Sequence, residues 1–193
     1  MTINAMTRLK ILLVEDDPDR RARIEDLISS ITDTFELEVI VSYEEVLKEI
    51  GLNNHDAYLV SKEFSDNRGL EIIWEISGQG CRGPALVLAN DDDPELESEA
   101  VNLGAMIYLV RDQLSSRFLE RMIRHAIDRK RYEDNIRDNQ EDLIKRMMDL
   151  QDSSERFEAQ SVEYVQMAED LAIAQGELEA ALADVTQSKQ ELE

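Results

Sequence analysis

Side chains that can bind ions or form hydrogen bonds follow the short apolar runs in the N-terminal part of the sequence. Glu15 and Asp16 follow the first run, Ser61 follows the third and Arg111 follows the fifth, while Ala89 closes the fourth. Carboxylates bind hard divalent cations or pair with basic groups, and hydroxyl and guanidinium groups bind anionic oxygens. If the runs are parallel strands, these positions meet at one edge of a sheet, where the functional groups of such folds gather.

The apolar runs have the length and aliphatic composition of buried β-strands. The predicted strands are Leu9–Val14, Glu36–Val41, Ala57–Val60, Ala85–Ala89 and Met106–Val110. Amphipathic stretches separate them, so strands and helices alternate over residues 9–128. This alternation predicts an α/β fold with a five-stranded parallel sheet, doubly wound because crossovers between parallel strands are right-handed.

Short motifs predict where helices begin and end in this region. Asp17 followed by Pro18 combines an N-cap residue with proline at the first helical position. Ser42 with Glu45 fits a capping box, and Gly51 stands where the following helix is expected to end.

The N-terminal part resembles the receiver domain of two-component response regulators. The matching segments are Lys10–Pro18, His55–Ser61, Gly69-Leu70, Gly83–Ala89 and Gly104–Arg111, in the order that the family has them. The resemblance implies a flavodoxin-like sheet with strand order 2-1-3-4-5 over residues 9–128, after an N-terminal tail of residues 1–8. It also implies a site in which an acidic pair and an acceptor carboxylate hold Mg²⁺, and a hydroxyl and a lysine bind the phosphoryl oxygens.

Three of the four functional positions depart from the family pattern. The acidic pair is present as Glu15 and Asp16, but the phosphoacceptor position is Ser61, the hydroxyl position is Ala89 and the lysine position is Arg111. A serine hydroxyl forms no acyl phosphate and is not ionised at neutral pH. The sequence therefore predicts a degenerate receiver, or pseudo-receiver, that is not an enzyme and needs no cofactor.

A residual metal site remains an alternative. Glu15, Asp16 and Glu63 together are compatible with weak Mg²⁺ binding. The favoured interpretation is that a basic side chain, Lys62 or Arg111, pairs with Asp16 in place of the cation.

The other reactive residues are interpreted as structural. Tyr108 matches the aromatic position that reports phosphorylation in active receivers, and here we expect a fixed packing or interface residue. Cys81, the single cysteine, has no partner for a disulfide and is expected to be a bystander thiol. Of the two histidines, His55 is placed in a loop and His125 on a solvated helix face, so no metal centre is predicted.

Residues 129–193 predict one long helix that continues the last receiver helix, from about Leu114 onward. An apolar residue recurs every seven positions, as expected for a coiled coil. These positions, called the seam below, are Ile136, Leu143, Leu150, Phe157, Tyr164, Leu171, Leu178, Val185 and Leu192. The same phase places Leu119 and Ala126 on the seam side of the preceding helix.

The heptads indicate a parallel homodimer. With the seam at d, many a positions are polar or small, such as Gln140 and Ser154, which predicts a weak seam for its length. The alternative register, with the seam at a, stays open. A helix of this kind has no core of its own, so a second helix is required as a partner.

Composition narrows the classes of partner. The chain carries 43 acidic against 21 basic residues, for a net charge of −22, so it repels nucleic-acid phosphates and anionic lipids. No apolar run reaches the ~20 residues of a membrane span, and a cytoplasmic location is expected.

The combined prediction is a phosphorylation-independent regulatory and dimerisation module. It would relay a signal through the coiled coil to an output domain beyond residue 193, a histidine kinase or a diguanylate cyclase. A protein partner at the receiver surface is compatible with this view. The alternative is a non-catalytic adaptor or scaffold that recruits a partner through its acidic coiled coil.

Overall fold

Five parallel strands form a single sheet in the N-terminal part of the chain. The computed structural model describes residues 8–31 and 34–190, with side chains described up to residue 179. The strands are β1 (Leu9–Val14), β2 (Phe35–Ile40), β3 (Ala57–Ser61), β4 (Ala85–Ala89) and β5 (Ile107–Val110). Their order is β2-β1-β3-β4-β5, so the predicted fold class and strand order are confirmed. Each predicted strand lies within one residue of the observed one.

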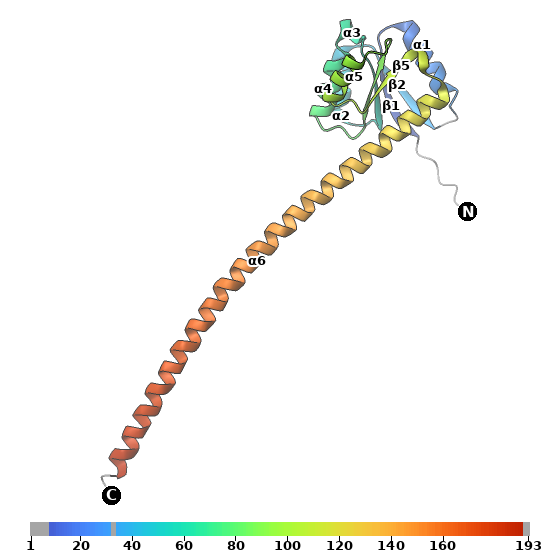
Figure 1. Ribbon diagram of the computed structural model, residues 1–193. Coiled ribbons are helices and arrows are strands. Elements are labelled where there is room, and N and C mark those ends of the chain that lie inside the picture. The colour runs from blue at the N-terminus through green and yellow to red at the C-terminus, as the bar shows by residue number, and fades with distance from the viewer. Residues whose placement is uncertain (1–7, 32–33, 191–193) are drawn as a thin grey trace, which may run out of the picture. The chain divides into compact units, whose positions relative to one another are not determined.

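Helices cover both faces of the sheet. They are α1 (Pro18–Ser29), α2 (Tyr43–Leu52), α3 (Phe64–Asn67), α4 (Gly69–Gly78), α5 (Pro94–Asn102) and α6 (Ser116–Gln190), with a 3₁₀ turn at Arg111–Gln113. Figure 1 shows α2, α4 and α5 on one face of the sheet and α1 on the other. The first turns of α6 pack on the same face as α1.

Alternation along the strands divides the buried side chains into two cores. Leu12 and Val14 of β1 pack with α2, α4 and α5, whereas Ile11 and Leu13 pack with α1 and α6. This is the period-two pattern of strands that are buried on both faces. The same alternation continues past the strand ends and decides which face each functional residue joins.

Two of the helix-end predictions need correction. Asp17 caps α1 as expected, with its carboxylate accepting from the backbone N–H groups of Asp19 and Arg20. Ser42 precedes α2 but makes no side-chain capping bond, so the capping box is not formed. Gly51 lies inside α2, and Asn53 takes the left-handed conformation that ends the helix (φ 52°).

The prediction that the seam reaches back into the start of α6 was wrong. Leu119 and Ala126 are fully buried in the core on the α1 face, together with Ile123 and Ile127. Their spacing of four, three and one residues is one face of a regular helix, and the sheet takes that face. Where α6 lies against the sheet, residues at heptad positions therefore belong to the core of the receiver fold.

The chain divides into two compact units, Met1–Asn135 and Ile136–Glu193, and α6 contains the boundary. The sequence pattern placed the domain boundary between residues 128 and 129. In the second unit α6 is helical to Gln190, and no helix of the described residues combines the length and apolar character needed to cross a membrane.

Candidate functional site

The candidate site lies at the carboxyl edge of the sheet. Glu15 follows β1, Ser61 is the last residue of β3, Ala89 is the last residue of β4, and Arg111 begins the 3₁₀ turn after β5. The strand order places β3 between β1 and β4, so all four positions belong to neighbouring strand ends. Crossover connections on both faces bring these ends together, as in other doubly wound sheets.

Arg111 is the centre of the site. Its side chain is 5% exposed, and its Nη2 atom lies 2.9 Å from Oε2 of the fully buried Glu15. The same nitrogen donates to the Ser61 hydroxyl oxygen at 2.6 Å and to the Leu88 carbonyl at 3.3 Å. It also lies 3.3 Å from Oε2 of Glu63. One guanidinium nitrogen therefore contacts the carboxylates of Glu15 and Glu63 and the hydroxyl of Ser61.

The hydrogen bonding of this buried arginine is incomplete. The 2.9 Å contact with Glu15 joins opposite charges, but Glu15 Oε2 accepts no well-aligned hydrogen bond within the described structure. Nε and Nη1 of Arg111 also lack hydrogen-bond partners there. Arg111 lines a surface hollow together with Arg20 and Asn90. The attraction between Arg111 and Glu15 is thus mainly that of two buried charges rather than a bidentate hydrogen-bonded pair.

A second arginine completes the neutralisation of the acidic side chains. Arg20 in the first turn of α1 donates to Glu63 Oε2 at 3.2 Å and lies 3.7 Å from Glu15 Oε1. Two guanidinium groups thus face the carboxylates of Glu15 and Glu63. The sequence interpretation missed Arg20, although a residue three positions after the Asp17 N-cap points back toward the strand ends.

The expected pairing of Asp16 with a basic side chain was wrong. Arg111 pairs with Glu15, and Asp16 instead accepts from the backbone N–H of Ser65 at 3.0 Å. Glu15 continues the side of β1 that carries Ile11 and Leu13, whereas Asp16 continues the opposite side. Successive side chains of a strand point to opposite faces, so only Glu15 turns toward Arg111.

Asp16 holds α3, which is a single tight turn rather than a regular helix. Three of its four residues, Ser65, Asp66 and Asn67, have positive φ angles, of 49°, 59° and 68°. Such conformations are costly for residues other than glycine and persist only where surrounding contacts hold them. The Asp16–Ser65 hydrogen bond is one such contact, and it commits the Asp16 carboxylate to the backbone.

Gly69 fixes the approach of α4 to the end of β3. A Cβ atom at this position would collide with the Ser61 carbonyl oxygen and lie 2.8 Å from the Lys62 Cα. Glycine is therefore required for α4 to begin this close to the strand. The contact explains sterically the glycine that follows Ser61 after eight residues.

Ala89 and Tyr108 lie where the sequence placed them, without forming part of the ion cluster. Ala89 is buried and offers no side-chain hydrogen bond. Tyr108 packs against the core on the α2 face, and its hydroxyl donates to the Asp91 carbonyl at 2.9 Å. Burial raises the pKa of the Tyr108 hydroxyl, and neighbouring Asp93 adds to the effect. The ring is thus held both by packing and by the loop after β4.

The cap of α1 beside the site gives a pH-dependent prediction. The pKa of the Asp17 carboxyl is lowered, first because the backbone N–H of Arg20 donates to it. A depressed pKa stabilises the fold above the ordinary pKa of aspartate, and this contribution is lost as the pH falls through the lowered value.

Replacing Asp17 by alanine should therefore lower the urea midpoint clearly at pH 7, and by less below a pH of about 4. Urea denaturation followed by circular dichroism at both pH values measures the two differences. An equal difference at both would show that the charge of Asp17 contributes nothing.

The seam residues lie on the surface of the second unit. Exposure runs from 50% at Ile136 to 71% at Leu150 and Phe157. The remaining seam residues with described side chains lie within that range, namely Leu143, Tyr164, Leu171 and Leu178. Val185 lies in α6 beyond the last described side chain, and Leu192 lies outside the described residues. Large apolar side chains recurring at this exposure on one helix are typical of an interface with another helix.

Comparison with solved structures shows that the fold is shared with signal receiver domains. The chain is similar to the signal receiver domain of a modulated diguanylate cyclase from Desulfovibrio desulfuricans, with 22% identity, a TM-score of 0.55, and coverage of 66% of this chain and 99% of that one. The signal receiver domain of an HD domain-containing protein from Pseudomonas fluorescens matches with 21% identity, a TM-score of 0.58 and coverage of 69% and 98%.

A third similar structure is the receiver domain of a sensor histidine kinase from Pseudomonas aeruginosa, which holds a magnesium ion in its active-site cleft. It matches with 21% identity, a TM-score of 0.55 and coverage of 63% of this chain and 99% of that one. No protein-family model matches the sequence, and neither does any curated protein. The chain therefore has the response-regulator receiver fold, followed by a long helix.

Proposed function

We propose that this chain is a phosphorylation-independent regulatory and dimerisation module of a two-component-type signalling protein. The observation that carries the proposal is the Arg111 guanidinium, which contacts Glu15, Ser61 and Glu63 at once. In the similar receiver from Pseudomonas aeruginosa, a magnesium ion occupies the active-site cleft. Here the positive charge in the site belongs to a side chain of the protein itself.

The electrostatics of the cluster disfavour a metal ion. Mg²⁺ needs carboxylate oxygens that are free to coordinate it, and it gives up its hydration shell reluctantly. Glu15 faces Arg111 and Arg20, and Asp16 is hydrogen-bonded to the Ser65 amide. A divalent ion would have to displace or approach two guanidinium groups. The residues present therefore fit poorly to Mg²⁺.

The same contacts disfavour phosphoryl transfer. Ser61 is fully buried, and its hydroxyl oxygen accepts from Arg111 and donates to Glu63 Oε2 at an O–O distance of 3.3 Å. The last residue of β3 is Ser61 rather than an aspartate, and the nearby Glu63 carboxylate is paired with Arg111 and Arg20. The receiver unit would then signal through surface contacts with a protein partner. No phosphorylation at the strand ends would be needed.

The long helix supports a dimeric relay. The exposed seam favours a parallel coiled coil, which transmits changes in helix register or orientation to whatever follows it. Two of the similar receivers belong to a diguanylate cyclase and a sensor histidine kinase. We propose an output domain of one of these two types beyond residue 193, acting in the cytoplasm.

Intact-mass spectrometry tests the proposal directly. The chain is incubated with acetyl phosphate and MgCl₂, with a phosphorylatable receiver in parallel to confirm that the donor is active. We expect the mass of the chain to stay unchanged. A stable adduct of about 80 Da on an aspartate would show that phosphorylation occurs after all.

An adaptor is the second candidate function. Apolar side chains also lie exposed on α6 outside the seam, among them Met148 at 64%, Val162 at 68% and Ile173 at 63%. A two-stranded coiled coil leaves such positions uncovered, so they favour a further partner. The two functions are distinguished by whether the full-length gene product carries a catalytic domain after residue 193.

A further inference from the structure

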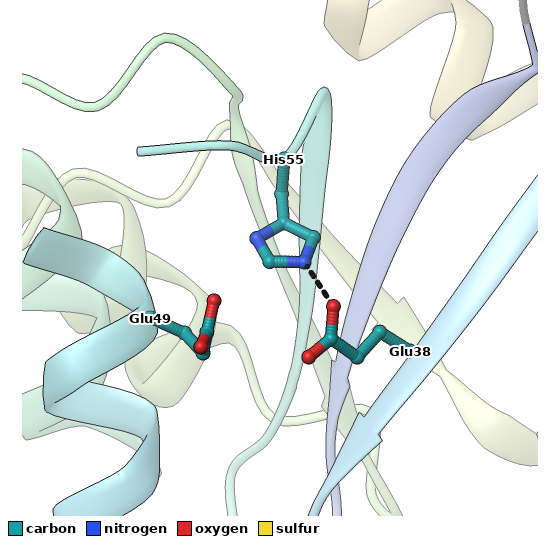
Figure 2. A group of neighbouring side chains, drawn as sticks. All are labelled: Glu38, Glu49 and His55. Carbon is teal, nitrogen blue, oxygen red and sulfur yellow. Dashed lines mark hydrogen bonds and ion pairs between the residues drawn. The ribbon is translucent and has the colours of Figure 1, made fainter. Parts of the chain in front are cut away.

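A second cluster of polar side chains lies under helix α2, on the face of the sheet that packs α2, α4 and α5. Glu38 on the edge strand β2, Glu49 on α2 and His55 before β3 each offer one ligand atom, and the three atoms lie within 4.8 Å of one another. Figure 2 shows the imidazole ring of His55 between the two carboxylates. None of these residues belongs to the candidate site described above.

His55 provides an observation that does not depend on the two carboxylates, Glu38 and Glu49. Its side chain is 2% exposed, and Nε2 lies 2.9 Å from Oε2 of Glu38. Nδ1 is buried and has no hydrogen-bond partner within the described structure. A neutral imidazole carries one N–H and one lone pair, so a ring that donates from Nε2 to Glu38 leaves a bare lone pair at the buried Nδ1, where nitrogen atoms are rarely left without a partner. With the proton on Nδ1 instead, the lone pair of Nε2 faces the Glu38 carboxylate, an arrangement that a cation between the two atoms would stabilise.

The charge of the cluster is also unbalanced. Two carboxylates contribute two negative charges, whereas His55 contributes at most one positive charge. A divalent cation would neutralise the carboxylates of Glu38 and Glu49 and take the lone pair of His55 Nε2 as a ligand. The combination of one imidazole with two carboxylates suits zinc and related first-row ions, because Mg²⁺ and Ca²⁺ prefer oxygen ligands alone.

We propose that Glu38, Glu49 and His55 form a binding site for one Zn²⁺ ion, which ties the edge strand β2 to helix α2 and to the start of β3. Zinc bonds of 2.0–2.2 Å place neighbouring ligand atoms roughly 3.3 Å apart in a tetrahedral site. The Glu38–His55 contact is already close to that value. Glu49 is only half-buried and moves toward the ring on binding, and water completes the fourth position.

The neighbouring thiol is not needed for this site. Cys81 is buried, and its sulfur lies 3.7 Å from the Ile50 carbonyl oxygen. Burial raises the pKa of this thiol, which keeps it protonated and a poor zinc ligand at neutral pH.

Zinc titration of the full chain tests the proposal. The protein is stripped with a chelator and titrated with ZnCl₂ by calorimetry, alongside Glu38→Gln, Glu49→Gln and Glu45→Gln. Glu45 lies one turn before Glu49 on α2, is exposed and carries the same charge, so it controls for general attraction to an acidic surface. Far-ultraviolet circular dichroism confirms that each variant is folded.

The expected result is one zinc ion per chain, bound about tenfold or more weakly by Glu38→Gln and Glu49→Gln and unchanged in Glu45→Gln. The chain has two histidines, His55 and His125, so their ring signals give a simple NMR readout. One equivalent of zinc should shift the His55 signals and leave those of His125 in place. Equal weak binding by all four proteins, or equal shifts of both rings, would overturn the proposal.

Discussion

Replacing Arg111 by methionine should lower the free energy of unfolding of the receiver-fold unit by about 3–5 kcal/mol. Methionine keeps much of the volume but removes the charge that faces Glu15, which is fully buried. A buried carboxylate without a counter-charge carries a desolvation cost that its remaining contacts, mainly the more distant Arg20, do not offset. The loss therefore arises from the isolated carboxylate rather than from one hydrogen bond.

Urea denaturation measures this loss, with the fluorescence of the single tryptophan, Trp74, reporting on α4 in the receiver-fold unit. Two controls sharpen the result. Arg23→Met removes an exposed ion pair with Asp112 and should cost below about 1 kcal/mol. Adding Glu15→Gln to Arg111→Met should restore much of the stability, because the uncompensated charge is gone. A cost below about 1 kcal/mol for Arg111→Met alone would contradict the buried pairing.

Replacing Leu143 and Leu150 together by aspartate should weaken dimerisation by at least about 1,000-fold. Both side chains lie in the seam and are 59% and 71% exposed in the single chain. In a dimer four such leucines would be buried, each contributing about 1.5–3 kcal/mol. Aspartate removes this contribution and brings like charges together across the interface.

Sedimentation equilibrium measures the dissociation constant. The matched control is Met148→Asp with Val162→Asp, which adds the same charge at equally exposed positions that lie outside the seam in either register. The control should remain dimeric, because neither position faces the partner helix. A monomeric wild-type chain would contradict the proposed dimer, and equal weakening by both pairs of substitutions would show that the interface does not follow the seam.

Most of the fold follows from local pattern. The five aliphatic runs gave strands within one residue because each is short, nearly continuous and bounded by turn-forming or capping residues. The parallel order depends on crossovers that have only one favourable hand. Predictions failed where tertiary contacts overrode a local signal. Leu119 and Ala126 fit the heptad phase, but the sheet buries them. The capping box is a different case: the motif is present, but the Ser42 side chain makes no capping bond.

The site was predictable as a set of positions but not as a set of contacts. The strand ends identified Glu15, Ser61 and Arg111, and their arrangement followed from topology. Which carboxylate meets the arginine depends on the side of the strand from which each side chain leaves. Counting outward from the buried residues of β1 would have separated Glu15 from Asp16. The Glu38–Glu49–His55 cluster had no such signal, since its members come from three elements without a shared motif.

Arg111 places a positive charge at the strand ends, beside Glu15, Ser61 and Glu63, and we propose that the site therefore takes no Mg²⁺. The most direct measurement is a Mg²⁺ titration of the isotope-labelled chain followed through the backbone amide signals of Glu15, Asp16 and Ser61. We predict that these signals stay in place up to about 10 mM Mg²⁺, a concentration at which weak oxygen-ligand sites are filled. A saturable shift of all three amides within that range would contradict the claim.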